Sequence, residues 1–149
     1  MVKLALPQDF KELLSILIGR EVRFLIVGGY AVAFHGHPRF TGDLDIWIDR
    51  SPPNAKKVLA ALKEFGFDSP NLRVEMFTGK DSITRMGIEP MKVEIFTHIP
   101  GLAFDESFSK SMTQVLGDTT QIPFLCLDDL KESKRVSGRA QDLADLEKL

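Results

Sequence analysis

The stretch VGGYAVAFHGHPRFTGDLDIWID, residues 27–49, decides how this chain folds. It begins at the end of an apolar run, residues 22–27, which predicts a buried strand. Gly28 and Gly29 follow at once, and residues 29–35 predict a short helix. A glycine turn at a helix start is a natural place for phosphate, because glycine lets the backbone approach a ligand closely. We therefore predict that both glycines contact a phosphate group.

The same stretch carries two acids, Asp43 and Asp45, at the start of a second apolar run, residues 44–48. Because side chains alternate along a strand, both carboxylates project from one face, together with Trp47. An exposed polar face on an edge strand would explain this pattern without any chemistry. Two carboxylates this close repel each other, however, and a cation is the usual way to neutralise them. We therefore predict a metal site. A metal site beside a phosphate-binding glycine turn indicates phosphoryl or nucleotidyl transfer.

A third acid occurs in MKVEIFTHIPG, residues 91–101. Glu94 lies in the middle of an otherwise apolar predicted strand, where an unpaired charge is costly. Two-metal sites generally use a further carboxylate from a neighbouring strand, and Glu94 is our candidate for it. The alternative is an ion pair with a basic residue of an adjacent strand, Arg73 or Arg85.

The remaining periodicity and the positions of Gly and Pro predict the other elements. Helices are expected at residues 7–19, 29–35, 51–66, 127–133 and 140–149, with a helical turn at 102–109 and Ser51 as the cap of the third helix. Strands are expected at 22–27, 44–48, 73–78, 82–88, 91–97, 113–116 and 121–125, the last two as a hairpin around residues 117–118. This order predicts an α/β (α+β) fold, a mixed β-sheet flanked by helices, in one domain over residues 1–149.

The composition limits the classes of protein that the chain can belong to. It has 149 residues, 44% of them hydrophobic and 27% charged, which is ordinary for a globular protein with a core. The net charge of -2 gives no overall attraction for nucleic acid, although a local basic patch remains open. No apolar run approaches the roughly 20 residues that span a membrane. We therefore expect a cytoplasmic protein without a membrane partner.

Gly28, Gly29, Asp43, Asp45 and Glu94 together resemble the nucleotidyltransferase superfamily of the DNA polymerase beta type. Its pattern is a glycine turn at a helix start, a D-x-D pair on the next strand and a third acid on a later strand. More narrowly, GGYAVAFHGHPRFTGDLDIWID, VEIFTHIPGLAF and LKESKRVSGRAQDLADLEKL resemble a group of small prokaryotic minimal nucleotidyltransferases. The third acid of that group is commonly Asp, so Glu94 is a departure.

The resemblance implies a chemistry for these positions. Asp43 and Asp45, with Glu94 as a further ligand or as the base, would hold two Mg²⁺ or Mn²⁺ ions. Gly28 and Gly29 would hold the phosphates of a nucleoside triphosphate, with ATP the expected substrate.

Basic residues near the glycine turn and in the C-terminal segment are expected to add to the nucleotide site. Arg39 and Thr41 lie in the loop before the acid pair, where they could reach the phosphates or remain solvated. Lys134 and Arg139 could hold the triphosphate, with Asp142 orienting Arg139. The alternative for this segment is a solvated helix joint in which Arg139 and Asp142 simply pair.

The resemblance implies transfer of a nucleoside monophosphate to a hydroxyl group on a protein, an RNA or a small molecule, within a toxin–antitoxin system. The alternative is a catalytically degenerate partner protein, such as an antitoxin, that keeps the fold for binding.

Two further patterns in the sequence would indicate a dinucleotide-binding unit or a zinc site. Asp49 follows Gly29 at the spacing of a dinucleotide-binding unit, but the fingerprint G-x-G-x-x-G is not met. His35, His37 and His98 lack the cysteines of a zinc site, and we expect structural or loop roles for them.

Overall fold

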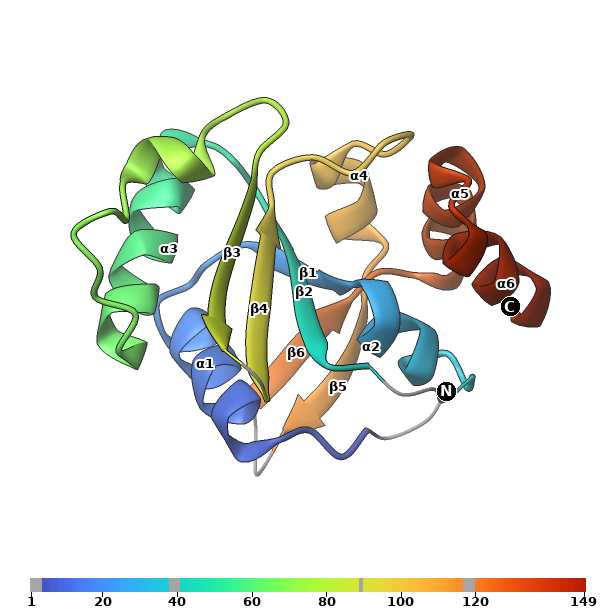
Figure 1. The fold of residues 1–149 in the computed structure, drawn as a ribbon, viewed down its shortest axis with the longest axis horizontal. Coiled ribbons are helices and arrows are strands. Elements are labelled where there is room, and N and C mark those ends of the chain that lie inside the picture. Colours follow the sequence, from blue (N-terminus) through green and yellow to red (C-terminus); the bar gives the residue numbers. More distant parts are fainter. Residues whose placement is uncertain (1–3, 38–40, 89, 117–119) are drawn as a thin grey trace.

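The computed structural model describes residues 4–37, 41–88, 90–116 and 120–149, and it contains one six-stranded sheet in the order β3-β4-β2-β1-β6-β5 (Figure 1). The strands are β1 (Phe24–Val27), β2 (Asp43–Ile48), β3 (Ile83–Ile88), β4 (Met91–Phe96), β5 (Met112–Leu116) and β6 (Thr120–Phe124). β2 runs parallel to β4 and β1 runs parallel to β6, whereas the other neighbours are antiparallel. The predicted mixed sheet flanked by helices is therefore confirmed.

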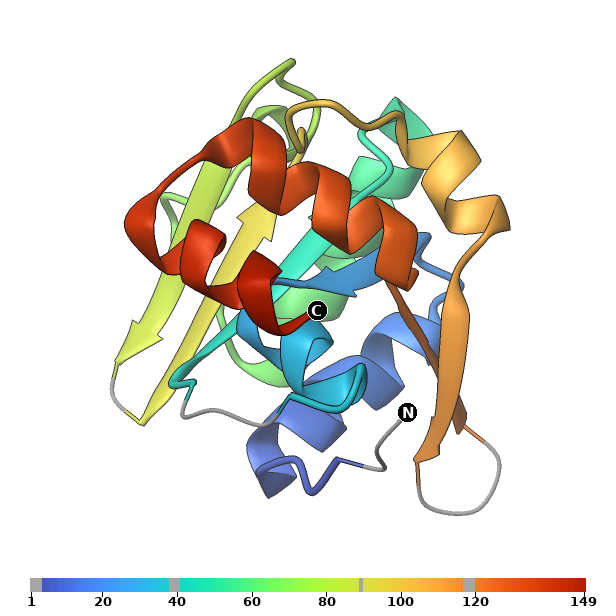
Figure 2. The same ribbon diagram turned by 90° about the vertical axis from the view of Figure 1, so that its right-hand side faces the viewer.

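Helices cover both faces of the sheet. They are α1 (Gln8–Gly19), α2 (Gly28–Phe34), α3 (Pro52–Phe65), α4 (Phe104–Ser109), α5 (Leu127–Ser137) and α6 (Ala140–Lys148). α1 and α3 pack on one face, and their buried side chains join the larger core cluster. α4 and α5 pack on the other face around a second cluster, and α5 and α6 lie side by side across that face in Figure 2. No helix within the described ranges is long and apolar enough to cross a membrane.

β2 lies in the centre of the sheet, between β1 and β4. Leu44, Ile46 and Ile48 are fully buried on the α1–α3 face, as an alternating strand requires. On the opposite face Trp47 is only 2% exposed and packs edge-on against Phe104 of α4. The alternative of an exposed edge strand is therefore wrong, because both faces and both edges of β2 are covered along its C-terminal half.

The start and end of α3 show how local sequence sets the boundaries of a helix. Pro52 and Pro53 stand in its first turn, where a missing N–H costs nothing. Gly66 ends it with a left-handed φ of 118°, which favours glycine. Ser51 precedes the helix as predicted, but its side chain makes no capping hydrogen bond. Its backbone N–H instead donates to Oδ1 of Asp49 at 2.9 Å.

The predicted strand at residues 73–78 is wrong. Val74–Phe77 forms a 3₁₀ helix, η1, in which the N–H of Met76 donates to the carbonyl of Arg73 at 3.1 Å. Phe77 is fully buried in the larger core cluster, so the single turn anchors the connection between α3 and β3. The predicted hairpin is confirmed as β5 and β6, while its turn, residues 117–119, lies outside the described residues.

Candidate active site at the centre of the sheet

Strand register brings the predicted acids together. Asp45 of β2 is opposite Val27 at the end of β1 and opposite Glu94 in β4. Asp43 is opposite Lys92 in the same β2–β4 pairing. Register partners on neighbouring strands project to the same face, so Glu94 lies on the face that carries both aspartates. The pairing of β2 with β4 therefore brings the three predicted acids together on one face of the sheet.

Gly28 packs directly against Asp45. A Cβ atom at position 28 would lie 2.9 Å from Cγ of Asp45 and closer still to Oδ2, so a larger residue does not fit. Gly28 also has a left-handed φ of 66°, which glycine adopts without strain. The carboxylate of Asp45 thus sits against the backbone where β1 turns into α2. Gly29 is buried in the first turn of α2.

Asp45 has the most strongly altered electrostatics of the three acids. Burial, with the nearby charges of Glu94 and Asp43, raises the pKa of Asp45 to about 7, although Lys134 and Arg139 oppose this change. Its Oδ1 is buried and has no hydrogen-bond partner among the described residues. A buried carboxylate oxygen without a donor, beside two further acids, is the arrangement that a hard cation satisfies. The residues present therefore fit a divalent metal ion.

Glu94 forms one of the ion pairs that the sequence left open. Its side chain is 19% exposed, and Oε2 lies 3.4 Å from Nε of Arg85 in β3, so Arg85 rather than Arg73 is the ion-pair partner. Burial raises the pKa of Glu94, Arg85 opposes the increase, and a hydrogen bond with Asp43 adds to it. In the described part of the chain, no three His, Cys, Asp or Glu side chains already surround a common metal position.

Two hollows open beside the acids. Asp45 and Gly28 line a cavity of about 320 Å³, which we call the Asp45 cavity. Asp43 and Glu94 line a smaller one of about 230 Å³, together with Arg85 and other residues of β3 and β4. The acids therefore lie between two spaces, one toward α5 and α6 and one toward the end of β3 and the start of β4.

The C-terminal basic residues line the Asp45 cavity as part of an ion-pair cluster, in which Lys134 is buried and the side chain of Arg139 is 79% exposed. Nζ of Lys134 lies 3.1 Å from Asp142 and 3.2 Å from Asp145. Asp142 also accepts hydrogen bonds from Nε of Arg139 at 2.7 Å and from Oγ of Ser137 at 2.5 Å. Lys134, Ser137, Arg139 and Asp142 all line the cavity. Asp142 therefore holds both predicted cations in the lining of the cavity that Asp45 also borders.

This cluster is strongly ionised. Burial alone would raise the pKa of Asp142, but hydrogen bonds from Arg139, Ser137 and Lys134 outweigh it and lower the pKa to about 2. The hydrogen bond and the charge of Asp142 in turn raise the pKa of Arg139. The alternative pairing of Arg139 with Asp142 is thus present, and the side chain of Arg139 is 79% exposed, whereas Lys134 is only 6% exposed.

The loop before β2 is only partly described. Thr41 donates from Oγ1 to the backbone carbonyl of Asp43 at 3.3 Å, so it holds the start of β2. Arg39, the other predicted residue of this loop, lies outside the described residues.

Several residues of the Asp45 cavity were not identified from the sequence. Its wall opposite the cluster includes Asp81 before β3, Ile83 in β3, Phe96 at the end of β4, and His98 and Ile99 just beyond it. Phe96 and His98 follow Glu94 at two-residue spacing, and in a strand this spacing predicts the same face as Glu94.

His35 has a different position and fits the expected structural role. Its Nε2 donates to the carbonyl of Leu125 at 2.8 Å, which ties the end of α2 to the end of β6.

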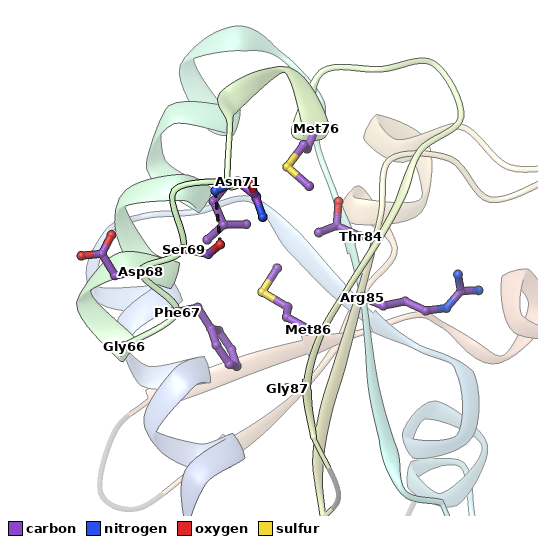
Figure 3. A pocket seen from close by; sticks show the side chains of 11 residues that line it. Gly66, Phe67, Asp68, Ser69, Asn71, Met76, Thr84, Arg85, Met86 and Gly87 are labelled. Carbon is purple, nitrogen blue, oxygen red and sulfur yellow. Dashed lines mark hydrogen bonds between the residues drawn. The ribbon is translucent and has the colours of Figure 1, made fainter.

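A further hollow of about 460 Å³ lies away from the acids, between the end of α3, η1 and β3 (Figure 3). It is lined by Phe67, Met76 and Met86, with Asp68 at its rim. Arg85 also borders it, but its side chain points away from this hollow in Figure 3, in line with its contact to Glu94. We therefore place the candidate active site at the acids and not in this larger space.

Comparisons with known proteins bear on the fold of the chain. The chain matches no protein-family model and no protein with a curated description. Among solved structures, it resembles a crystal structure from Thermotoga maritima of a protein named a "putative nucleotidyltransferase". The TM-score is 0.61, the sequence identity is 21%, and the match covers 93% of this chain and 88% of that chain. This likeness shows the fold alone: the chain has a nucleotidyltransferase-like α+β fold.

Proposed function

We propose that this protein is a metal-dependent nucleotidyltransferase of the small prokaryotic type, which moves a nucleoside monophosphate from a nucleoside triphosphate to a hydroxyl acceptor. The observation that carries the proposal is Asp45. Its buried carboxylate, with an unpartnered Oδ1, is register-paired with Glu94 and packed against Gly28. A structural role gives no reason to bury an unsatisfied carboxylate beside two others, whereas binding a cation does.

Asp43, Asp45 and Glu94 would hold Mg²⁺ or Mn²⁺, two ions as in the resembling superfamily, and such ions neutralise the triphosphate and lower the pKa of an attacking hydroxyl. Gly28 and Gly29, at the start of α2, would contact the phosphates beside Asp45.

Lys134 and Arg139 supply positive charge on the same cavity wall. An ammonium group has three donors, and the described contacts of Lys134 use two of them, to Asp142 and Asp145. The third is available to an anionic oxygen in the Asp45 cavity. Asp142 would keep both cations aligned while the triphosphate enters.

ATP is our expected substrate, and the acceptor is a protein, an RNA or a small molecule. We also propose that the protein acts on, or together with, a partner in a toxin–antitoxin pair.

A second candidate function is a degenerate partner protein that keeps the fold for binding. The Arg85–Glu94 ion pair favours it, because a carboxylate already paired with a guanidinium is a poorer metal ligand. The lack of a ready-made three-acid metal position among the described residues points the same way.

Incubation with each α-labelled nucleoside triphosphate, Mg²⁺ or Mn²⁺ and a prokaryotic lysate tests the first candidate. We expect label on an acceptor from the wild type, none from Asp45→Asn, and full labelling from Asp9→Asn, an exposed acid of α1 on the opposite face. The degenerate alternative predicts no label from any of the three proteins. It also predicts that Asp43→Asn and Asp45→Asn leave partner binding intact.

A further inference from the structure

The far wall of the Asp45 cavity is a cross-strand patch on β3 and β4. Ile83 is paired with Phe96, and the next residues are joined by hydrogen bonds from the N–H of Thr97 to the carbonyl of Ser82 at 3.0 Å and from the N–H of Ser82 to Oγ1 of Thr97 at 2.8 Å. Asp81 and His98 are the next residues beyond this hydrogen-bonded pair, one on each chain segment. Both of them line the cavity, as do Ile83 and Phe96.

The strand sets the distance between this patch and the acids. Glu94 and Phe96 share one face of β4, and alternate residues of a strand are about 7 Å apart. Phe96 is therefore about 7 Å from the Asp45–Glu94 pair along the sheet, and His98 lies beyond it. This span is comparable to that of the sugar and base beyond the α-phosphate of a nucleotide.

The chemistry of the patch changes along its length. Nearest the acids it is apolar, because Ile83 is 44% exposed and Phe96 is half-buried. At its far end it is polar, because Asp81 and His98 have neither a hydrogen-bond nor an ion-pair partner within the described ranges. An apolar face followed by an acceptor and a ring nitrogen suits a flat heterocycle with a polar edge.

We propose that this patch binds the base of the nucleotide and that Asp81 selects bases with an exocyclic amino group, as adenine and guanine have. The inference rests on the proposed function. Ile83 and Phe96 contact the face of the base. The carboxylate of Asp81 accepts a hydrogen bond from the amino group, and it disfavours a keto oxygen at the same place because it has no proton to donate. His98 donates from a ring nitrogen to a nitrogen of the base.

Pairs of nucleotides that differ by one amino group test this assignment. We would measure binding by calorimetry, with Ca²⁺ present, of ATP against purine riboside triphosphate and of GTP against ITP. A hydrogen bond to a charged group contributes roughly 1.5–3 kcal/mol, so we expect the wild type to prefer the amino partner of at least one pair by about tenfold or more. The pair that shows the preference distinguishes adenine from guanine.

Asp81→Ala should bring that ratio close to one, whereas His98→Ala should weaken binding of both members and keep the ratio. Asp68→Ala is the matched control, because it removes an exposed acid at the rim of the other hollow (Figure 3) and should keep both affinity and ratio. If Asp81→Ala folds and binds but retains the wild-type ratio, the base assignment is overturned and the proposed function stands. If the wild type binds no nucleotide, the proposed function fails and this inference with it.

Discussion

The side chain of Asp45 lies so close to Gly28 that position 28 has no space for a Cβ atom. This contact joins the end of β1 to the centre of β2, and it fixes the carboxylate at the point where α2 begins. The glycine that the sequence assigns to phosphate binding therefore has a structural duty as well, since it makes room for the carboxylate.

Gly28→Ala should lower the free energy of unfolding by about 3 kcal/mol, because it combines a left-handed backbone with a collision in a packed site. Gly36→Ala is the control: φ there is 99°, but an added Cβ would have open space around it, so we expect a loss of about 1 kcal/mol. Urea denaturation measures both. Removing the carboxylate with Asp45→Ala should reduce the cost of Gly28→Ala. Equal costs with and without Asp45 would contradict the collision.

The raised pKa of Asp45 predicts how stability changes with pH in the absence of metal. The folded protein keeps the Asp45 proton up to a pH of about 7, whereas the unfolded chain loses it near pH 4. Between these values the folded state binds more protons, so stability falls as pH rises, by on the order of 3 kcal/mol for this group. Asp45→Asn has no such titration. In EDTA it should therefore become more stable than the wild type as pH rises from 4 to 8.

Denaturation at a series of pH values checks this difference, with Asp9→Asn as the control that should follow the wild type. A constant difference between the wild type and Asp45→Asn across this range would show that Asp45 has an ordinary pKa.

Metal binding should offset the loss of folding stability that the ionised carboxylate of Asp45 causes. At pH 7.5, Mn²⁺ or Mg²⁺ at a hundred times its dissociation constant should stabilise the wild type by about 2.7 kcal/mol. Asp45→Asn should lose this response in a thermal unfolding assay, and Glu94→Gln should weaken it. Arg85→Ala should strengthen it, because it frees Glu94 from its ion pair. An unchanged response in Asp45→Asn would remove that residue from the metal site.

Asp142→Asn should destabilise the protein by about 3 kcal/mol, because it leaves the buried Lys134 with one carboxylate in place of two. Glu132→Gln breaks an exposed pair with Arg135 and should cost less than about 0.5 kcal/mol. Denaturant unfolding compares the two. The pKa of Asp142 is lowered to about 2, so its contribution is complete above about pH 4 and is lost as pH falls toward 2. A cost no greater than that of Glu132→Gln would mean that the cluster contributes little.

The sequence was enough to place the acids because their positions depend on local periodicity. Asp43 and Asp45 alternate with buried residues in one strand, and Glu94 alternates with Val93 and Ile95 in another, so each face follows from two-residue spacing. Both strands were long enough and apolar enough to predict. The three acids share one face because β2 and β4 are neighbours in the sheet, with Asp45 opposite Glu94.

The features that the sequence did not predict depend on tertiary contacts. Residues 73–78 resemble a strand in composition, yet burial of Phe77 beneath α3 favours a single 3₁₀ turn. Asp81 and His98 line the same cavity because the β3–β4 pairing brings their segments together. The double pairing of Lys134 with Asp142 and Asp145 requires α5 and α6 to fold back on each other, which spacing along one helix does not show.

The parallel pairing of β1 with β6 has a consequence for the order of folding. Ile26 is opposite Phe124, and α5 and α6 leave the sheet directly after β6. Contacts between segments so far apart in the chain form slowly, because a long loop must close before they contribute. The three acids lie on β2 and β4, whereas Lys134 and Arg139 follow β6 in the chain. We therefore expect a chain that ends before residue 120 to carry the acids without the cations, so a site with both charges depends on the last part of the sequence.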